Sequence, residues 1–478
     1  MKNVNKIICI TVLAVLNVGC TLHNEKQTEG SSMNQSKQII DKVRSQLDKA
    51  KKRQKYNAFI HLANQSAIDR AIEISNSAEL SRQPLAGLTL AIKDNIQVKG
   101  MPNTSGHKLL SEFIPVNDAE VIAQVKSAGA IIIGKANMHE LAYGITSNNS
   151  AFGAVANAHN PLKFAGGSSG GTAVAIALGL VDAGLGSDTG GSVRIPAALN
   201  GIVGFRPTTG RYSNVGLNMI STTRDTVGPM AQDVNTVARL DAVLSGQVES
   251  LILPEANKLR LGVPKNYFYE NLSNDVAQSM EALLIKLRKA GIELVMVSMG
   301  NVPALNEQIS FPVVMYETNQ LLPEFLETSL PNVSMDTFID GISSPDVRGV
   351  IHAIVNQPIP RDVYDNAIKV LKPQLQASYS NYFSDNNLDA MIIPATPLAA
   401  QNIEGSDVNV LLNGNKVPTF ATFIRNTDPA SNAGFPSLVV PLGKNSEGLP
   451  IAAQLEGPLN SDRKLLAIVA LVEGLIKQ

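Results

Sequence analysis

Two serines stand in two separate glycine-rich segments, and their surroundings suit nucleophilic chemistry. Ser168 lies in GGSSGG, and Ser192 lies further along the chain in DTGGS. Glycine lets the backbone approach a ligand closely and adopt conformations that other residues avoid. A nucleophilic serine must lose its proton to a nearby base, and the oxyanion that forms needs hydrogen-bond donors. Two such turns joined by an apolar helical segment therefore predict a nucleophile site and not a flexible linker.

The first glycine segment also contains the pattern G-x-S-x-G, at Gly166, Ser168 and Gly170, which is typical of α/β-hydrolases. That fold requires a strand directly before the serine, whereas the preceding residues NAHNPLKFA are interrupted by Pro161. It also requires a downstream histidine, and His352 in IHAIVN is the only histidine that follows Ser168. The α/β-hydrolase interpretation is therefore weak. A P-loop is excluded because no Gly-Lys-Ser/Thr follows the glycines.

The elements that must position these serines alternate between strands and helices, which predicts an α/β core. Apolar residues at helical spacing predict helices over 36–50, 119–128, 172–180 and 275–290. Apolar runs predict strands that end at Lys93 and Leu185, and strands over 130–133, 258–263, 292–297, 388–393, 438–442 and 451–455. A closing helix over 462–476 is expected to have Ser461 as its cap. Because no repeat or low-complexity linker interrupts the body, one large domain is expected.

Three segments together resemble the amidase signature family: GGSSGG, then DTGGSVRIPA, then GFRPTTGR. The resemblance covers roughly residues 57–243 and the C-terminal stretch TDPASNAGFPSLVVPLG…GLPIAAQLEG. It implies a single large α/β domain with a central mixed twisted sheet covered by helices on both faces. It also implies an enzyme that hydrolyses linear amides and needs no cofactor. No Cys/His cluster in the sequence suggests a metal site.

In that family the catalytic group is a Ser–cis-Ser–Lys triad, and the resemblance carries its three roles onto this chain. Ser192 matches the nucleophile, Ser168 the bridging serine after a cis peptide bond, and Lys93 in LAIKDNI the base. A lysine, with a reference pKa of about 10.4, is a poor base unless burial depresses that value. Lys93 follows an apolar strand, so burial is expected. Asp94 would oppose the depression if its side chain pointed the same way.

The backbone N–H groups of the second glycine segment are expected to form the oxyanion hole, from Thr189, Gly190, Gly191 and Ser192. Ser192 would attack an amide carbonyl, ammonia or an amine would leave, and water would hydrolyse the acyl-enzyme. Structural roles are expected for five other polar residues: Asp188, Arg194, His107, His139 and His159.

Within the family, KANMHELAYGITSNNSAFGAVAN and GSDTGGSVRIPAAL are most similar to indoleacetamide and mandelamide hydrolases, which indicates a primary arylacetamide as the small-molecule substrate. A peptide amidase acting on C-terminal amides is one alternative, and a non-catalytic exported binding lipoprotein is another. The glutamyl-tRNA amidotransferase A subunit is disfavoured by the N-terminal segment described below. Residues 302–387, which carry no clear pattern, are expected to shape the pocket.

The 478 residues have a net charge of −1 and 5% aromatic content with no tryptophan. Nucleic-acid binding usually requires clustered Lys and Arg and aromatic side chains on which bases stack, so this composition argues against a nucleic-acid partner. A homodimer is left open.

The N-terminus, MKNVNKIICITVLAVLNVGC, has Lys2 and Lys6 before an apolar run over 7–16 that is too short to span a membrane. We therefore expect a signal peptide over 1–19, a polar tether over 20–35 and the amidase domain over 36–478. LNVGC resembles the lipobox of bacterial lipoproteins, which predicts an exported protein anchored to the membrane through a lipid on Cys20. It departs from that pattern because Asn17 takes the usual Leu position, so a plain secretory signal is the alternative.

Overall fold

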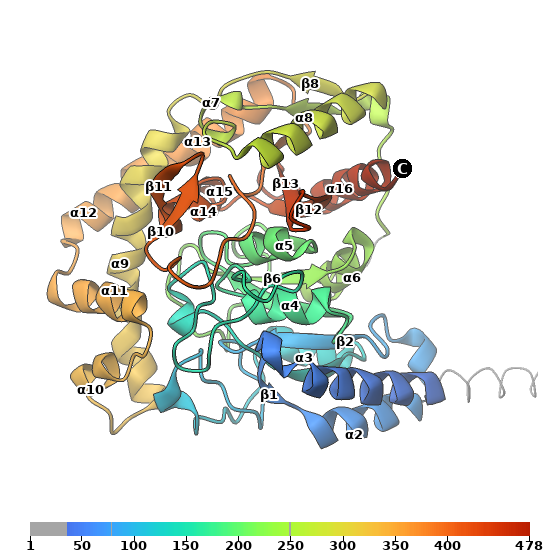
Figure 1. Ribbon diagram of the computed structural model, residues 1–478, viewed down its shortest axis with the longest axis vertical. Coiled ribbons are helices and arrows are strands. Elements are labelled where there is room, and N and C mark those ends of the chain that lie inside the picture. Colours follow the sequence, from blue (N-terminus) through green and yellow to red (C-terminus); the bar gives the residue numbers. More distant parts are fainter. Residues whose placement is uncertain (1–35, 78, 248–249) are drawn as a thin grey trace, which may run out of the picture.

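A central mixed sheet organises the molecule. The computed structural model describes residues 36–77, 79–247 and 250–478, so the expected signal peptide, the tether and Cys20 lie outside the described residues. The sheet has eleven strands in the order β1-β3-β2-β4-β6-β5-β12-β13-β9-β7-β8. Helices cover both of its faces (Figure 1), which confirms the expected fold class. Within the described residues, no helix is long and apolar enough to cross a membrane.

Parallel pairing occurs towards both ends of the sheet, in β3-β2-β4 and in β9-β7-β8, and antiparallel pairing joins the remaining neighbours. The strands are β1 (Phe59–Leu62), β2 (Thr89–Lys93), β3 (Ile131–Ala136), β4 (Ala183–Asp188), β5 (Val203–Arg206), β6 (Thr226–Ala231), β7 (Arg260–Gly262), β8 (Glu293–Val295), β9 (Ala390–Pro394), β12 (Ser437–Lys444) and β13 (Pro450–Glu456). A separate antiparallel hairpin is formed by β10 (Asn409–Leu412) and β11 (Asn415–Pro418).

Successive side chains of a strand point to opposite faces of a sheet, and here both faces are covered by apolar clusters. In β2, Leu90 and Ile92 lie in one core cluster, while Ala91 between them lies in another. The first face is covered by α3 (Glu120–Ser127), α6 (Val234–Ser245), α8 (Asn274–Lys289) and α16 (Asp462–Lys477). The second face is covered by the helix at 36–52, α2 (Asn64–Ser75), α4 (Gly170–Ala177) and α5 (Arg194–Asn200).

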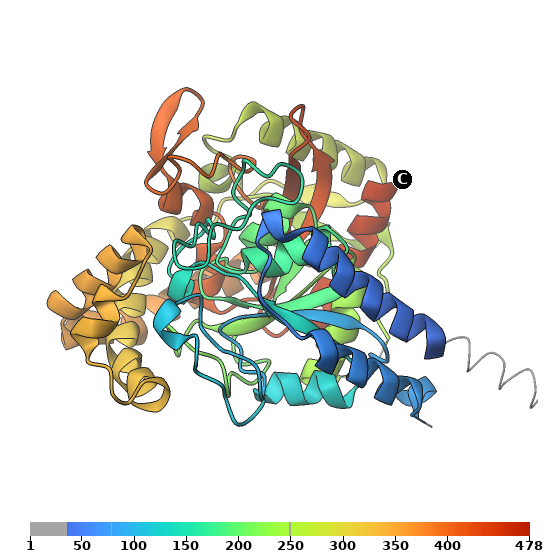
Figure 2. The same cartoon turned by 60° about the horizontal axis from the view of Figure 1, so that its bottom comes forward.

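The segment without a clear sequence pattern forms a group of helices, most of which lie beside the sheet at the left of Figures 1 and 2, while the last shares an apolar cluster with β9. Its members are α9 (Val302–Ser329), α10 (Met335–Asp340), α11 (Pro345–Asn356), α12 (Arg361–Asn366) and α13 (Lys372–Asp385), with a π-helical turn at Ala367–Leu371. Helix α9 packs on α13 through one apolar cluster and on α10 and α11 through another. Three short helices complete the fold: α7 (Lys265–Phe268), α14 (Thr419–Ile424) and α15 (Asp428–Ala433).

One expected detail of the closing helix is wrong. Ser461 does precede α16, but its hydroxyl donates to the carbonyl of Pro458 at 2.6 Å and makes no bond to the first turn. A capping residue normally has an extended backbone that lets its side chain reach the first free N–H groups. Ser461 has φ −93° and ψ 23°, which is not that conformation.

Candidate active site

Lys93 is the last residue of β2 and is completely buried. Its Nζ lies 2.7 Å from Oγ of Ser168 and 2.8 Å from Oγ of Ser187. Ser187 belongs to β4, the parallel neighbour of β2. Because the carboxyl ends of parallel strands meet at the same edge of a sheet, Ser187 near the end of β4 lies within reach of the amine at the end of β2.

The surroundings of Lys93 favour the neutral amine. Burial lowers the pKa of Lys93 to about 7, while the carboxylates of Asp225 and Asp188 oppose the change. Asp94 does not contribute, because its carboxylate turns to Lys135 at 3.1 Å and accepts a bond from the backbone N–H of Thr104 at 2.9 Å. A lysine with this pKa is partly unprotonated near neutral pH and can accept a proton.

Ser168 is completely buried and follows a cis peptide bond from Gly167. The expected cis bond is therefore present. The carbonyl of Ser168 accepts a hydrogen bond from the backbone N–H of His139 at 3.1 Å. The N–H of the next residue, Ser169, donates to the carbonyl of Ser192 at 3.1 Å. The two serine turns that the sequence singled out are thus tied to each other through the main chain.

Ser192 lies in the turn between β4 and α5 and is 8% exposed. It lines a cavity of about 280 Å³ together with Thr189 and Gly190 of the same turn. Within residues 36–77, 79–247 and 250–478, no protein atom accepts a hydrogen bond from the backbone N–H of Gly190, Gly191 or Ser192. These are the donors that an oxyanion bound at Ser192 would need.

Glycine is required at the centre of this turn. Gly191 has φ +145°, a conformation that side chains rarely adopt. A Cβ at this position would come within 2.2 Å of Oγ1 of Thr427. The Gly191 backbone therefore packs directly on the C-terminal segment that carries Thr427.

A buried carboxylate supports the turn that carries Ser192. Asp188 accepts bonds from Nε of Arg194 at 3.0 Å, from Nη1 of Arg206 at 3.0 Å and from the N–H of Val193 at 3.2 Å. Burial alone would raise the pKa of Asp188, but the two guanidinium groups hold it well below its usual range. These contacts agree with the structural roles expected for Asp188 and Arg194.

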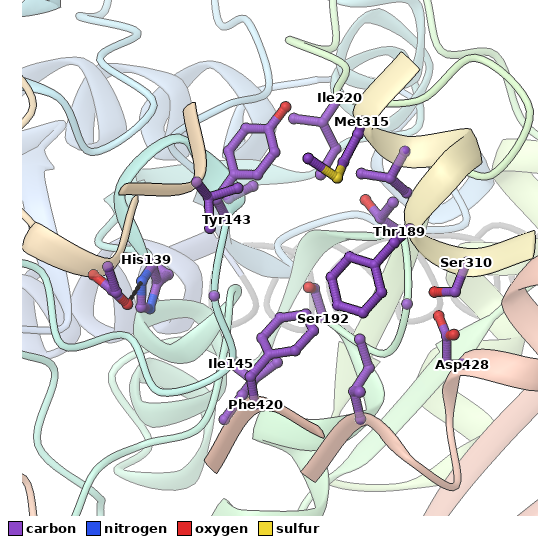
Figure 3. A pocket seen from close by; sticks show the side chains of 18 of the residues that line it. His139, Tyr143, Ile145, Thr189, Ser192, Ile220, Ser310, Met315, Phe420 and Asp428 are labelled. Carbon is purple, nitrogen blue, oxygen red and sulfur yellow. Dashed lines mark hydrogen bonds and ion pairs between the residues drawn. The ribbon is translucent and has the colours of Figure 1, made fainter. Parts of the chain in front are cut away.

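The cavity is walled mainly by apolar side chains from the helices beside the sheet (Figure 3). Helices α9 and α11 contribute Phe311, Val314, Met315, Val350 and Ile354, and α14 contributes Phe420 and Ile424. The loop before α4 adds Tyr143 and Ile145, and Ile220 closes the wall. Residues 302–387 therefore help to shape the pocket, as expected, whereas the contribution of α14 was not foreseen.

Four of the charged or chargeable groups at the cavity contact one another, and the fifth, Asp407, accepts a bond from Nδ2 of Asn148 at 2.7 Å. Nε2 of His139 lies 3.1 Å from the carboxylate of Asp346 on α11, and Arg224 pairs with Asp428. A substrate that carried its own charge would have to compete with these pairs. The lining therefore suits a neutral, largely apolar acyl group.

The histidines divide into two groups. His107 bonds Glu140 at 2.8 Å and His159 bonds the carbonyl of Asn200 at 2.9 Å, which agrees with the structural roles expected for them. His139 is also bonded, but it faces the cavity (Figure 3). His352 is exposed on α11 and does not line the cavity, so it is not the downstream histidine that the α/β-hydrolase interpretation requires.

Sequence reasoning did not identify four residues that contact the site: Ser187, Arg224, Asp225 and Thr427. Ser187 stands within the same GSDTGGS segment as Ser192, so its place in the motif could have drawn attention to it. Thr427 lies in the C-terminal TDPASNAG segment that carried part of the resemblance. No group of His, Cys, Asp and Glu that could hold a metal occurs in the part of the chain that the structure describes.

Comparisons with known proteins identify relatives of this chain. The family model described as Amidase matches residues 41–466. The indoleacetamide hydrolase of Rhizobium radiobacter is 42% identical over 393 residues, which cover 82% of this chain and 84% of that protein. The mandelamide hydrolase of Pseudomonas putida is 37% identical, with 94% of this chain and 91% of that protein covered. A solved structure described as an amidase superimposes with a TM-score of 0.80 at 32% identity, over 91% of this chain and 96% of its own.

Proposed function

Because this chain belongs to the amidase family and is an amide-hydrolysing enzyme, we propose that it cleaves primary arylacetamides through an acyl-enzyme on Ser192. The observation that carries the mechanism is the fully buried contact between Nζ of Lys93 and Oγ of Ser168. This contact lies beside a turn whose nucleophile candidate, Ser192, opens onto the cavity.

The proposed relay runs from Ser192 through Ser168 to Lys93. The neutral amine of Lys93 accepts the proton of Ser168, and Ser168 accepts that of Ser192 as its Oγ attacks the amide carbon. The oxyanion is stabilised by the N–H groups of the turn. The C–N bond then breaks, and the relay returns its proton to the leaving nitrogen, which departs as ammonia.

Deacylation reverses the direction of the relay. A water molecule loses a proton to the relay as its oxygen attacks the carbonyl carbon of the acyl group bound to Oγ of Ser192. The ester bond breaks, the proton returns to Oγ of Ser192, and a carboxylic acid leaves. The relay thus ends each turnover in its starting protonation state.

Three features support an aryl acyl group. The cavity wall contains Phe311, Phe420 and Tyr143, and aromatic rings pack well against one another. The cavity volume of about 280 Å³ lies near the lower end of the range for small-molecule sites, roughly 300–1,000 Å³. Two of the curated relatives are named for hydrolysis of indoleacetamide and mandelamide.

The test is a substrate panel with purified protein, in which ammonia release is measured. The panel contains indole-3-acetamide, mandelamide, phenylacetamide, glutamine and an N-acetylated dipeptide amide. We expect the arylacetamides to have the highest kcat/KM, and Ser192→Ala to abolish their hydrolysis while leaving the protein folded. Preference for the dipeptide amide would favour the peptide amidase alternative, and activity in Ser192→Ala would contradict the acyl-enzyme.

We also propose that the enzyme is exported and anchored by a lipid on Cys20, a proposal that rests on residues 1–20 of the sequence alone. The test is metabolic labelling of the expressing cells with a fatty-acid analogue. Label is expected in the wild type and not in Cys20→Ser. Export without label would leave a plain secretory signal as the better interpretation.

A further inference from the structure

The turn that carries Ser192 is held through its carbonyl groups by two donors from distant parts of the chain and by one from the helix that follows it. Nε of Arg224 donates to the carbonyl of Thr189 at 3.1 Å. Oγ1 of Thr427 lies 2.6 Å from the carbonyl oxygen of Gly190. The N–H of Ile195 donates to the carbonyl of Gly191 at 2.7 Å. Three successive carbonyl groups therefore have a fixed direction.

The direction of a carbonyl determines the direction of the next N–H. A trans peptide unit is planar, and its C=O and N–H point in opposite directions. The cis bond that the structure shows in the described residues joins Gly167 and Ser168, so the peptide units of this turn are trans. Holding the carbonyl of Gly190 thus fixes the N–H of Gly191, and holding that of Gly191 fixes the N–H of Ser192.

From these contacts we infer that Thr427 is a positioning residue for the oxyanion hole. Its hydroxyl holds the Gly190–Gly191 peptide in the orientation that keeps the N–H of Gly191 available for the oxyanion. The inference deepens the proposed function and rests on Ser192 being the nucleophile. A group that orients donors before the reaction stabilises the transition state more than the bound substrate.

The environment of Thr427 favours this role over general packing. The residue is completely buried, and its hydroxyl is closer to the Gly190 carbonyl than to that of Ile424, which lies at 3.0 Å. Its own carbonyl accepts a bond from Nη1 of Arg194 at 2.8 Å. Arg194 in turn bonds Asp188, so the position of the Thr427 hydroxyl is set by the same network that holds the turn.

The test compares Thr427→Ser with Thr427→Ala, which differ from each other by one hydroxyl group. Thr427→Ser keeps the donor and loses the methyl, so its kcat should remain within about twofold of the wild type. Loss of a whole oxyanion donor lowers kcat by about 100- to 1,000-fold, and misorienting one should cost on the order of tenfold or more. We therefore expect kcat of Thr427→Ala on phenylacetamide to fall by roughly that factor with KM nearly unchanged.

A second readout separates positioning from structural loss. Benzylboronic acid, in which boron takes the place of the carbonyl carbon of phenylacetamide, forms a tetrahedral adduct with a nucleophilic serine, so its affinity should fall in Thr427→Ala by the same factor as kcat/KM. Binding of 2-phenylethanol, which is neutral, carries the same ring and forms no such adduct, should stay the same. If Thr427→Ala does not fold, Thr427→Val provides the same comparison, since it also lacks the hydroxyl but retains the volume.

The inference is overturned if folded Thr427→Ala keeps kcat within twofold of Thr427→Ser, or if boronate and 2-phenylethanol affinities fall together. Failure of the proposed function has a different signature, because Ser192→Ala would then retain activity or the boronate would not bind the wild type.

Discussion

The ammonium group of Lys135 lies 3.1 Å from the carboxylate of Asp94, and both side chains are completely buried. Burial lowers the pKa of Lys135, and the adjacent carboxylate opposes that change. Lys135 also donates to Oδ1 of Asn103 at 2.7 Å. Because Asp94 directly follows Lys93, this pair anchors the strand end that presents the proposed base.

Removing the Asp94 charge should destabilise the protein without changing its chemistry. Asp94→Asn would leave the Lys135 ammonium without its buried partner, and breaking such a pair typically costs about 3–5 kcal/mol. Urea unfolding should show a loss of that order, and the double variant Asp94→Asn/Lys135→Met should recover most of it. A loss under about 1 kcal/mol in the single variant would show that the pair is unimportant.

The activity should rise with pH up to about 7 and then level. The proposed relay needs Lys93 unprotonated, and burial lowers the pKa of Lys93 to about 7. Below that pH, kcat/KM should fall by about tenfold per pH unit as the amine gains its proton. Initial rates between pH 5 and 9 measure the profile. The residual activity of Lys93→Ala should lack this acidic limb, the part of the profile in which activity rises with pH. If the limb persisted in that variant, it would report the titration of another group.

Asp225 should set the position of that limb. Its carboxylate is the largest electrostatic influence that raises the pKa of Lys93 against the effect of burial. Asp225→Asn should therefore lower the Lys93 pKa and shift the limb towards lower pH. Asp94→Asn is the matched control, because Asp94 faces Lys135 and should leave the limb in place. An upward shift in Asp225→Asn would contradict this electrostatic assignment.

Phe420 should contribute to binding of the aryl group. Its ring lies 6.2 Å from that of Phe311, and the two side chains are 39% and 60% exposed at the cavity. A bound aryl ring would cover this apolar surface. Losing about 1–2 kcal/mol of the binding free energy that such burial contributes weakens binding roughly 5- to 30-fold. Steady-state kinetics should show a KM increase of that size for indole-3-acetamide in Phe420→Ala, with kcat nearly unchanged. Acetamide, which has no ring, should show no change, and an equal effect on both amides would contradict ring binding.

The sequence predicted those helices and strands whose apolar residues recur at helical spacing or form a continuous run. The helix expected over 275–290 is α8 (Asn274–Lys289), and the strand expected to run through Leu185 is β4 (Ala183–Asp188). Helix α9 escaped prediction because its apolar residues face several partners and Pro312 and Pro323 lie inside it. Lys93, Ser168 and Ser192 could be selected because each lies in a distinctive local motif. Asp225 lies in no such motif, and although Thr427 lies in a segment that carried part of the resemblance, its contact with Gly190 joins segments far apart in the sequence and shows only in the structure.

The cavity is bounded by two kinds of structure. The sheet and its adjoining turns supply Lys93, Ser168 and Ser192, whereas α9, α11 and α14 supply most of the apolar wall. The residues of the proposed relay and most residues of the apolar wall thus belong to separate parts of one fold. Substitutions on the helices can change which acyl group is accepted while the bond-breaking machinery stays intact. An ancestral protein with this architecture could acquire new amide substrates through substitutions on the helices, with each successive variant still active.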